Sequence, residues 1–193
     1  YSDIIRTLDK IYRKDDSYLN FIIGKALFEK KEYEKSIFYL NRIKKNPTYT
    51  FESSFLKSII FRILKDYKKS TTNQKIAYES YHSHLRELES KYNSLIENND
   101  FQEAKKTIKE KVKARSNMSE LCLDMYLHHE KDKGSQFYLN QSINIYSNNH
   151  KALYYMGLYH KNRCLNESLT YFIKSLQQEW DFYEGHVQIA ECY

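Results

Sequence analysis

The sequence predicts an all-α protein built from consecutive helical hairpins, and two observations support this fold class. The 193 residues include only four glycines and one proline, Pro47, whereas proteins made of sheets and turns use more of both. Small residues also recur along the chain at a spacing close to the length of one helix-turn-helix unit. A fixed period of that length is typical of solenoids, in which each hairpin buries its apolar face against its neighbours.

Five small residues mark successive copies of this unit. The markers are Ser36, Ser70, Ala104, Ser135 and Ser168, and the steps between their residue numbers are 34, 34, 31 and 33. A bulky residue stands three positions before the marker in the first three copies, as Tyr33, Tyr67 and Phe101, whereas the fourth copy has Asp132 there.

This pattern resembles the tetratricopeptide repeat (TPR), a helix-turn-helix of about 34 residues. That family places small residues at the eighth and twentieth positions of each repeat, where the two helices cross closely. In a first repeat at 17–50, Gly24 and Ser36 fall on these positions. In a repeat that starts at residue 150, Gly157 and Ser168 do so if the turn is one residue shorter. The same shift predicts Ala190 at the small position of a repeat that starts at 183.

The resemblance implies a TPR-like right-handed superhelix (an α-solenoid) and a single helical-repeat domain over 1–193. The expected repeats are 17–50, 51–84, 85–115, 116–149 and 150–182, with the start of another at 183. We expect the chain to be an excerpt of a longer protein. Ahead of the first repeat, Ile4, Leu8 and Ile11 predict an opening helix that Ser2 or Asp3 would cap.

The repeat pattern weakens in the middle of the chain. In the second repeat Lys57 and Ser58 replace the expected Leu-Gly pair. No helix breaker occurs between residues 72 and 97, which leaves two interpretations: one longer helix near 73–97 that interrupts the repeats, or a hairpin with a tight turn near residues 82–84. The apolar residues Tyr81, Leu85, Leu88, Tyr92 and Leu95 follow a heptad spacing there. A clearer turn is predicted at residues 98–100, with Asp100 as the N-cap of the next helix.

The charge and the cysteines limit the partners and the compartment. With 31 basic and 25 acidic residues the net charge is +6, a mild excess that does not favour nucleic acid as a partner. No stretch approaches the roughly 18 apolar residues of a membrane-spanning helix, so we expect no membrane span. Three widely spaced cysteines, Cys122, Cys164 and Cys192, favour a reducing, intracellular location, either nuclear or cytoplasmic.

Residues that could carry chemistry do not form a recognisable motif. His82 and His84 lie two apart and would point in nearly opposite directions on a helix, so they cannot share a metal ion. No metalloprotease motif, nucleophile elbow or phosphate-binding glycine loop is present. We therefore expect a protein that is not an enzyme and has no catalytic residues, metal or cofactor. The basic run 105–115 is interpreted as a solvated helix face, because it has no aromatic residues for stacking on RNA.

The TPR resemblance implies a binding groove lined by the first helix of each repeat. In the first repeat the matching positions are Tyr18, Phe21, Lys25, Phe28 and Glu29. Co-chaperones of this family that bind a C-terminal carboxylate need lysine and asparagine where Phe21 and Lys25 stand, so we do not expect that clamp. An aromatic groove suits an apolar or helical protein ligand. The alternative is that Phe21 and Phe28 only pack on a preceding helix.

By this resemblance the function is protein–protein scaffolding. Two segments, 24–40 and 55–64, also resemble the N-terminal repeats of scaffold subunits of the anaphase-promoting complex, a ubiquitin ligase of the cell cycle, which implies homodimerisation through this region. Three other functions stay open: a TPR co-chaperone or targeting receptor that binds peptides, an RNA-associated helical-repeat protein, and an enzyme whose active part lies outside this sequence.

Overall fold

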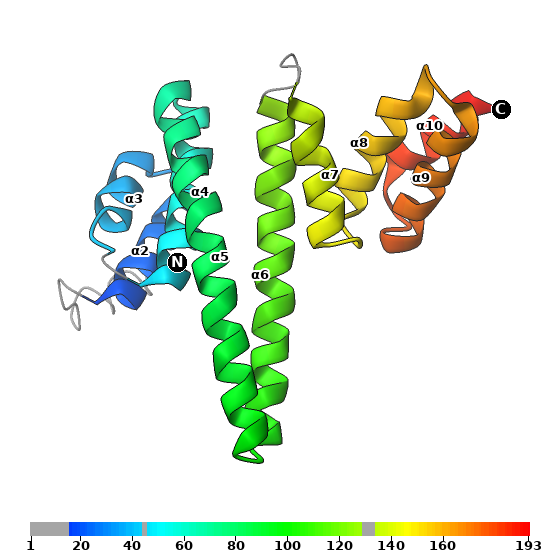
Figure 1. The fold of residues 1–193 in the computed structure, drawn as a ribbon. Helices are drawn as coiled ribbons and strands as arrows, with labels where there is room; N and C mark the ends of the chain where they lie inside the picture. Colours follow the sequence, from blue (N-terminus) through cyan, green and yellow to red (C-terminus); the bar gives the residue numbers. More distant parts are fainter. Residues whose placement is uncertain (1–15, 44–45, 129–133) are drawn as a thin grey trace. The chain divides into compact units, whose positions relative to one another are not determined.

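The computed structural model describes residues 16–43, 46–128 and 134–193, and every regular element within these ranges is an α-helix (Figure 1). The chain divides into two compact units, one that extends to Thr107 and one that runs from Ile108 to Tyr193. The opening helix predicted around Ile4 to Ile11, and the departure from the pattern at Asp132, lie outside the described residues.

The first unit contains two complete hairpins and the tip of a third. Its elements are α2 (Ser17–Glu29), α3 (Tyr33–Leu40), α4 (Pro47–Ile63), α5 (Tyr67–Glu97) and the first turns of α6 (Phe101–His128). Acidic or amide side chains cap α2, α4, α5 and α6. Asp16 accepts a hydrogen bond from the backbone N–H of Leu19 at 3.0 Å, and Asp100 accepts one from that of Glu103 at 3.1 Å. The N-cap predicted at Asp100 is therefore confirmed.

The turns inside these three hairpins share one backbone geometry. Lys31, Lys65 and Asn99 follow one another at the predicted interval of about 34 residues, and each has a positive φ, of 63, 60 and 59° respectively. The residue after each donates its N–H to a carbonyl of the preceding helix at 2.8 to 2.9 Å: Glu32 to Leu27, Asp66 to Phe61 and Asp100 to Leu95. This is the Schellman ending of a helix, and its recurrence shows that the predicted period is present in the backbone.

The middle of the chain is continuous helix. α5 runs unbroken for 31 residues, so the single-long-helix interpretation is confirmed and the tight turn near residues 82–84 is wrong. His84 lies on this helix as a buried residue. No glycine or proline interrupts the segment, so helical hydrogen bonding continues where the family has a turn. The predicted repeat boundaries 50/51, 84/85 and 115/116 accordingly fall inside α4, α5 and α6.

The second unit contains the rest of α6 followed by α7 (Ser135–Ile145), α8 (His150–Lys161), α9 (Leu165–Gln178) and α10 (Tyr183–Cys192). α8 and α10 begin at the residues predicted as repeat starts, 150 and 183. Asn149 caps α8 by accepting the N–H of Ala152 at 3.0 Å. The core of this unit gathers residues from α6, α7 and α8: Leu123, Tyr126, Leu139, Ala152 and Met156.

Three hairpins are joined at their closest crossing by the same hydrogen bond. A fully buried serine of the second helix donates its hydroxyl to a backbone carbonyl of the first helix. The pairs are Ser36 to Gly24 at 2.7 Å, Ser70 to Ser58 at 2.9 Å and Ser168 to Gly157 at 2.9 Å. Ser58, which the sequence pattern presents as a departure, therefore takes the same place as a glycine. The 11-residue separation in the last pair, against 12 in the others, reflects the shorter turn predicted there.

The glycines at these crossings have no room for a side chain. A Cβ atom at Gly24 would lie 2.7 Å from a methyl carbon of Leu40, and one at Gly157 would lie 2.5 Å from the ring of Phe172. Both neighbours are buried in the core. The absence of a Cβ is what lets the second helix of each hairpin approach this closely.

The crossing of α6 and α7 is built differently. Ser119 and Ser142 donate to each other's backbone carbonyl at 2.8 Å, and the side-chain amide of Asn149 donates to the Ser119 hydroxyl at 2.8 Å. Ser135, the predicted marker, is buried at the start of α7, seven residues before the serine that makes the crossing bond.

The two remaining markers occupy unlike positions. Ala104 is buried on α6. Ala190 is exposed on α10, and that helix instead approaches α9 through Gly185, where a Cβ would lie 2.8 Å from Leu176.

Candidate functional site

The predicted groove residues share one face of α2. Tyr18, Phe21, Lys25 and Phe28 recur at intervals of three and four residues, so they follow one stripe of the helix. Tyr18 is 54% exposed and Lys25 is also exposed, whereas Phe21 and Phe28 are half-buried. The stripe is thus partly packed and partly open to a ligand.

The structure brings two of these residues together with a third ring from the next hairpin. Tyr49, in the first turn of α4, has its ring centroid 5.7 Å from that of Phe21 and 6.0 Å from that of Tyr18. Tilted rings at these distances attract one another through their quadrupoles. We call Tyr18, Phe21, Lys25 and Tyr49 the aromatic face. Sequence reasoning missed Tyr49, because the boundary at 50/51 assigned it to the end of the first repeat.

Phe28 has a different neighbour. Its ring lies 6.1 Å from that of Tyr33 on α3, so it stabilises the end of its own hairpin. Glu29 is exposed beside it. The alternative that Phe21 and Phe28 pack on a preceding helix concerns residues 1–15, which lie outside the described part of the chain.

α4 carries two partly buried cations. The Lys57 ammonium donates a hydrogen bond to Asn41 Oδ1 at 3.3 Å and so ties α4 to the end of α3. Burial lowers the pKa of Lys57 and also that of Arg62, because removal from water disfavours the charged form. Lys57 stands where the family has an apolar residue, and its role here is to connect the first two hairpins.

Within the described residues, no three His, Cys, Asp or Glu side chains come together as a group that could hold a metal ion. His82 is exposed on α5 and His84 is buried, in agreement with their predicted opposite directions. Cys122 is fully buried, and burial raises the pKa of its thiol to about 12. A thiol with that pKa is inert at neutral pH.

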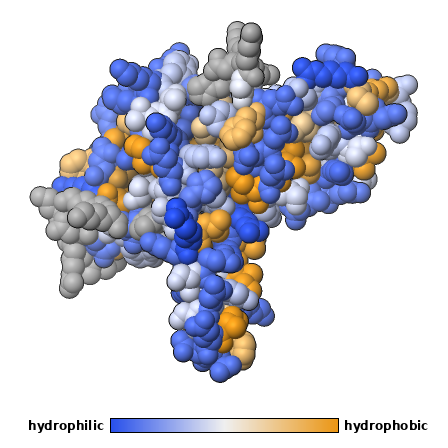
Figure 2. Space-filling view, viewed as in Figure 1, coloured by the Kyte–Doolittle hydropathy of each residue, from blue (hydrophilic) through white to orange (hydrophobic). Residues whose placement is uncertain are grey.

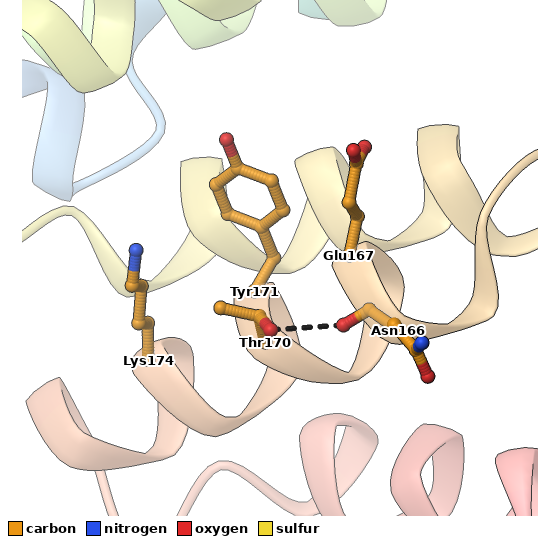
Figure 3. A pocket seen from close by; sticks show the side chains of 5 residues that line it. All are labelled: Asn166, Glu167, Thr170, Tyr171 and Lys174. Carbon is orange, nitrogen blue, oxygen red and sulfur yellow. Dashed lines mark hydrogen bonds between the residues drawn. The ribbon is translucent and has the colours of Figure 1, made fainter.

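A hollow of about 390 Å³ opens on α9 (Figure 3). Glu167, Tyr171 and Lys174 point the same way into it, and Asn166 and Thr170 complete the lining. Both charged residues of the lining already have partners. Glu167 lies 2.6 Å from Nδ1 of His160, and the Lys174 ammonium lies 5.5 Å from the centre of the Tyr171 ring. The hollow is therefore a polar surface recess of the α8–α9 hairpin.

On the face drawn in Figure 2, hydrophilic residues cover most of the surface and hydrophobic residues are interspersed among them. The basic run on α6 is a solvated helix face, as predicted, since Lys105, Lys109, Lys113 and Arg115 are all exposed. Across the described ranges, no helix combines the length and the apolar character needed to cross a membrane.

Comparison with known proteins finds likeness in structure only. No family model matches the chain. A search of the curated proteins likewise gives no match. Solved structures do match, among them TTC0263, a thermophilic TPR protein in Thermus thermophilus. It is 14% identical, with a TM-score of 0.44 over 92% of this chain and 98% of its own.

Two further solved structures are similar to this chain. MamA from residue 41 to its end, from Desulfovibrio magneticus RS-1, is 15% identical with a TM-score of 0.39, covering 88% of this chain and 98% of its own. YrrB, described as a TPR protein with an unusual peptide-binding site, is 12% identical with a TM-score of 0.37, covering 95% and 96%. At such identities and TM-scores the likeness says nothing of partner or function.

The chain's own geometry decides the fold. Turns of one geometry recur with the predicted period at Lys31, Lys65 and Asn99, and a buried serine meets a small residue of the partner helix at three crossings. A helix-turn-helix unit that recurs about every 34 residues is the signature of the tetratricopeptide repeat. The fold is of the tetratricopeptide type. Two long helices, α5 and α6, depart from it where the TPR array would have turns.

Proposed function

We propose that this chain is a non-catalytic protein–protein interaction scaffold that acts inside the cell, in the nucleus or the cytoplasm. The observation that carries the proposal is the aromatic face. Three rings from α2 and α4 lie together, Lys25 follows on the same stripe of α2, and Tyr18 keeps 54% of its surface exposed. An apolar or helical segment of a partner protein is the ligand that such a surface suits.

The scaffold fixes these rings before a partner arrives. α2 is tied to α3 by the buried bond from Ser36 to Gly24, and its first turn is capped by Asp16. Tyrosine and phenylalanine have few side-chain torsions, so little entropy is lost when they bind. Aromatic residues in this setting commonly supply most of the binding energy of an interface.

The finer proposal concerns the assembly to which the scaffold belongs. The resemblance of 24–40 and 55–64 to scaffold subunits of the anaphase-promoting complex supports a role in that ubiquitin ligase, with self-association through this region. The matched segments cover α3, a part of α2 that includes Lys25, and a part of α4, and the aromatic face lies on α2 and α4.

The test is affinity purification of the tagged full-length protein from its own cells, followed by mass spectrometry. We expect ubiquitin-ligase scaffold subunits in stable proportion. A double variant, Tyr18→Ala with Phe21→Ala, should lose these partners by about tenfold or more. Phe38→Ala is the matched control, because Phe38 is 53% exposed on α3, outside the aromatic face. Equal recovery with both variants would remove the aromatic face from the proposal.

Self-association has its own measurement. Light scattering of this chain across micromolar concentrations should show a dimer that the double variant converts to monomer, while circular dichroism confirms that the variant is folded. A strict monomer for the unaltered chain contradicts the self-association. Recovery of chaperones or RNA-bound proteins in the purification contradicts the assignment to the ubiquitin ligase.

A further inference from the structure

The connection between α9 and α10 presents the only tryptophan of the chain to solvent. Trp180 is 72% exposed, and Tyr183, three residues later, is 74% exposed. Tryptophan is highly buried on average in folded proteins. It is also among the residues most enriched at the energetic centres of protein interfaces. Two rings this exposed on one short connection call for a functional explanation.

The backbone that carries these rings is held in place. Phe182, between them, packs its ring 5.1 Å from those of Tyr154 and His150 on α8. The His186 ring is hydrogen-bonded to the Trp180 carbonyl at 2.8 Å, and its centroid lies 5.1 Å from that of the indole at an interplanar angle of 83°. The connection is therefore anchored inside while its exposed rings face water, and a partner would meet a preorganised surface.

The charge of this connection is opposite to that of the chain. Glu179, Asp181 and Glu184 are all exposed and alternate in sequence with the aromatic residues. No lysine or arginine occurs from residue 179 to residue 193, in a chain whose net charge is +6. We call residues 179–184 the acidic aromatic loop.

We propose that the acidic aromatic loop is a docking surface for a lysine- or arginine-rich segment of a partner protein. Cationic side chains can lie on the faces of indole and phenol rings, while the three carboxylates accept charge-assisted hydrogen bonds from them. The same carboxylates repel phosphate, so nucleic acid is not the ligand. The surface lies in the second unit, and the proposal is independent of the aromatic face on α2 and α4.

The single tryptophan makes the test direct, because the intrinsic fluorescence of the chain reports on Trp180. The probes are two synthetic peptides of equal length, one with arginine alternating with alanine and one with glutamate in place of arginine. We expect a saturable change in Trp180 emission with the arginine peptide, weakened by added salt. No change is expected with the glutamate peptide.

Matched charge variants distinguish binding at the acidic aromatic loop from attraction to the overall charge of the chain. The triple variant Glu179→Gln, Asp181→Asn, Glu184→Gln should bind the arginine peptide about tenfold or more weakly. The control triple Glu34→Gln, Glu87→Gln, Glu97→Gln removes the same charge from exposed positions elsewhere and should bind like the unaltered chain. Calorimetry with Trp180→Ala should show the same loss without relying on fluorescence.

Three outcomes would overturn the proposal. One is equal weakening by both triple variants, which would reduce the binding to net charge. Another is an emission change of the same size with the glutamate peptide. The third is a concentration-dependent emission shift without peptide together with a dimer in sedimentation, which would assign the loop to a second copy of this chain.

Discussion

The α8–α9 and α5–α6 hairpins differ in their interiors. In α8–α9, Gly157 lets the fully buried Phe172 ring lie against the backbone, and Ser168 bonds across the crossing. In α5, no residue after Leu88 is buried. The serine-to-carbonyl bond has no counterpart in α5–α6, because the register that pairs Ser36 with Gly24 would pair Ala104 with Tyr92, and alanine has no hydroxyl.

In the other hairpins of the first unit the turn and the small pair at the crossing occur together, whereas α5–α6 has the turn alone. Asn99 adopts the same positive φ as Lys31 and Lys65, so the turn of α5–α6 is that of an ordinary hairpin. Only the small pair at the crossing is lost. The turn thus sets the direction in which the chain reverses, and the small pair sets how closely the helices pack. A repeat can lose the second feature and keep the first.

The largest effect expected from this comparison comes from filling a crossing. Gly157→Leu places a side chain where a Cβ would already lie 2.5 Å from Phe172. Overpacking outweighs the gain in helix propensity, so the free energy of unfolding in urea should fall by about 2 kcal/mol. Ser90→Leu, at an exposed position of α5, is the control and should change it by less than about 0.5 kcal/mol. Equal effects would show that the crossing is not tight.

The second-largest effect should be a difference in amide hydrogen exchange between the α5–α6 and α8–α9 hairpins. Few side chains of residues 89–107 are buried, whereas residues 152–172 contain the packed crossing of α8 and α9. We expect protection factors about tenfold or more lower in the first segment, measured by mass spectrometry on peptides of each hairpin. Similar protection in both would mean that the turn alone stabilises a hairpin.

The crossing bond itself should have a smaller effect. Ser36→Ala removes a buried hydroxyl that donates to the Gly24 carbonyl at 2.7 Å. Its loss should lower the free energy of unfolding by about 1 kcal/mol. Ser90→Ala, on the open part of α5, should leave it unchanged or raise it slightly because alanine favours helix. A Ser36→Ala variant as stable as the unaltered chain would show that size alone matters at the crossing.

The smallest effect concerns an ion pair next to the packed crossing. The Lys161 ammonium lies 2.6 Å from a carboxylate oxygen of Glu191 on α10, and this hydrogen bond lowers the pKa of Glu191 and raises that of Lys161. The pair therefore stabilises the folded chain fully between the ordinary glutamate pKa of 4.5 and the ordinary lysine pKa of 10.5. This stabilisation is lost as the pH falls through the lowered pKa of Glu191 or rises through the raised pKa of Lys161.

Because Glu191 is exposed and Lys161 is only half-buried, Glu191→Gln should lower the melting temperature only slightly at pH 7. The difference from the unaltered chain should vanish well below pH 4.5. Glu87→Gln, which removes an exposed carboxylate of α5, is the control. A constant difference at all pH values would assign the effect of Glu191→Gln to packing instead.

Sequence reasoning reached the period and the starts of α2, α6, α8 and α10, whereas the repeat starts expected at 51, 85 and 116 fall inside helices. Asn149 and Asp100 cap helices by contacts three residues away, and glycine or serine at a crossing is visible as a small residue in phase. It did not place Tyr49 on the aromatic face, because the repeat period put the boundary at 50/51, although Asn46 as N-cap and Pro47 at the first helical position mark the start of α4 locally. Ser142 was missed since its partner Ser119 lies 23 residues away, outside the regular register.

The positive-φ residues of the turns also affect the thermal stability of the chain. A side chain in that region costs about 1 kcal/mol relative to glycine, and Lys31 and Lys65 place exposed lysines there. Lys31→Gly and Lys65→Gly should therefore each stabilise the chain by roughly 0.5 kcal/mol once the greater freedom of glycine in the unfolded state is subtracted. Substitution of Asn99 by glycine should stabilise the chain less, since asparagine tolerates this conformation. Neither turn contributes a residue to either proposed binding surface, so a more thermostable form of the protein could retain its contacts with partners.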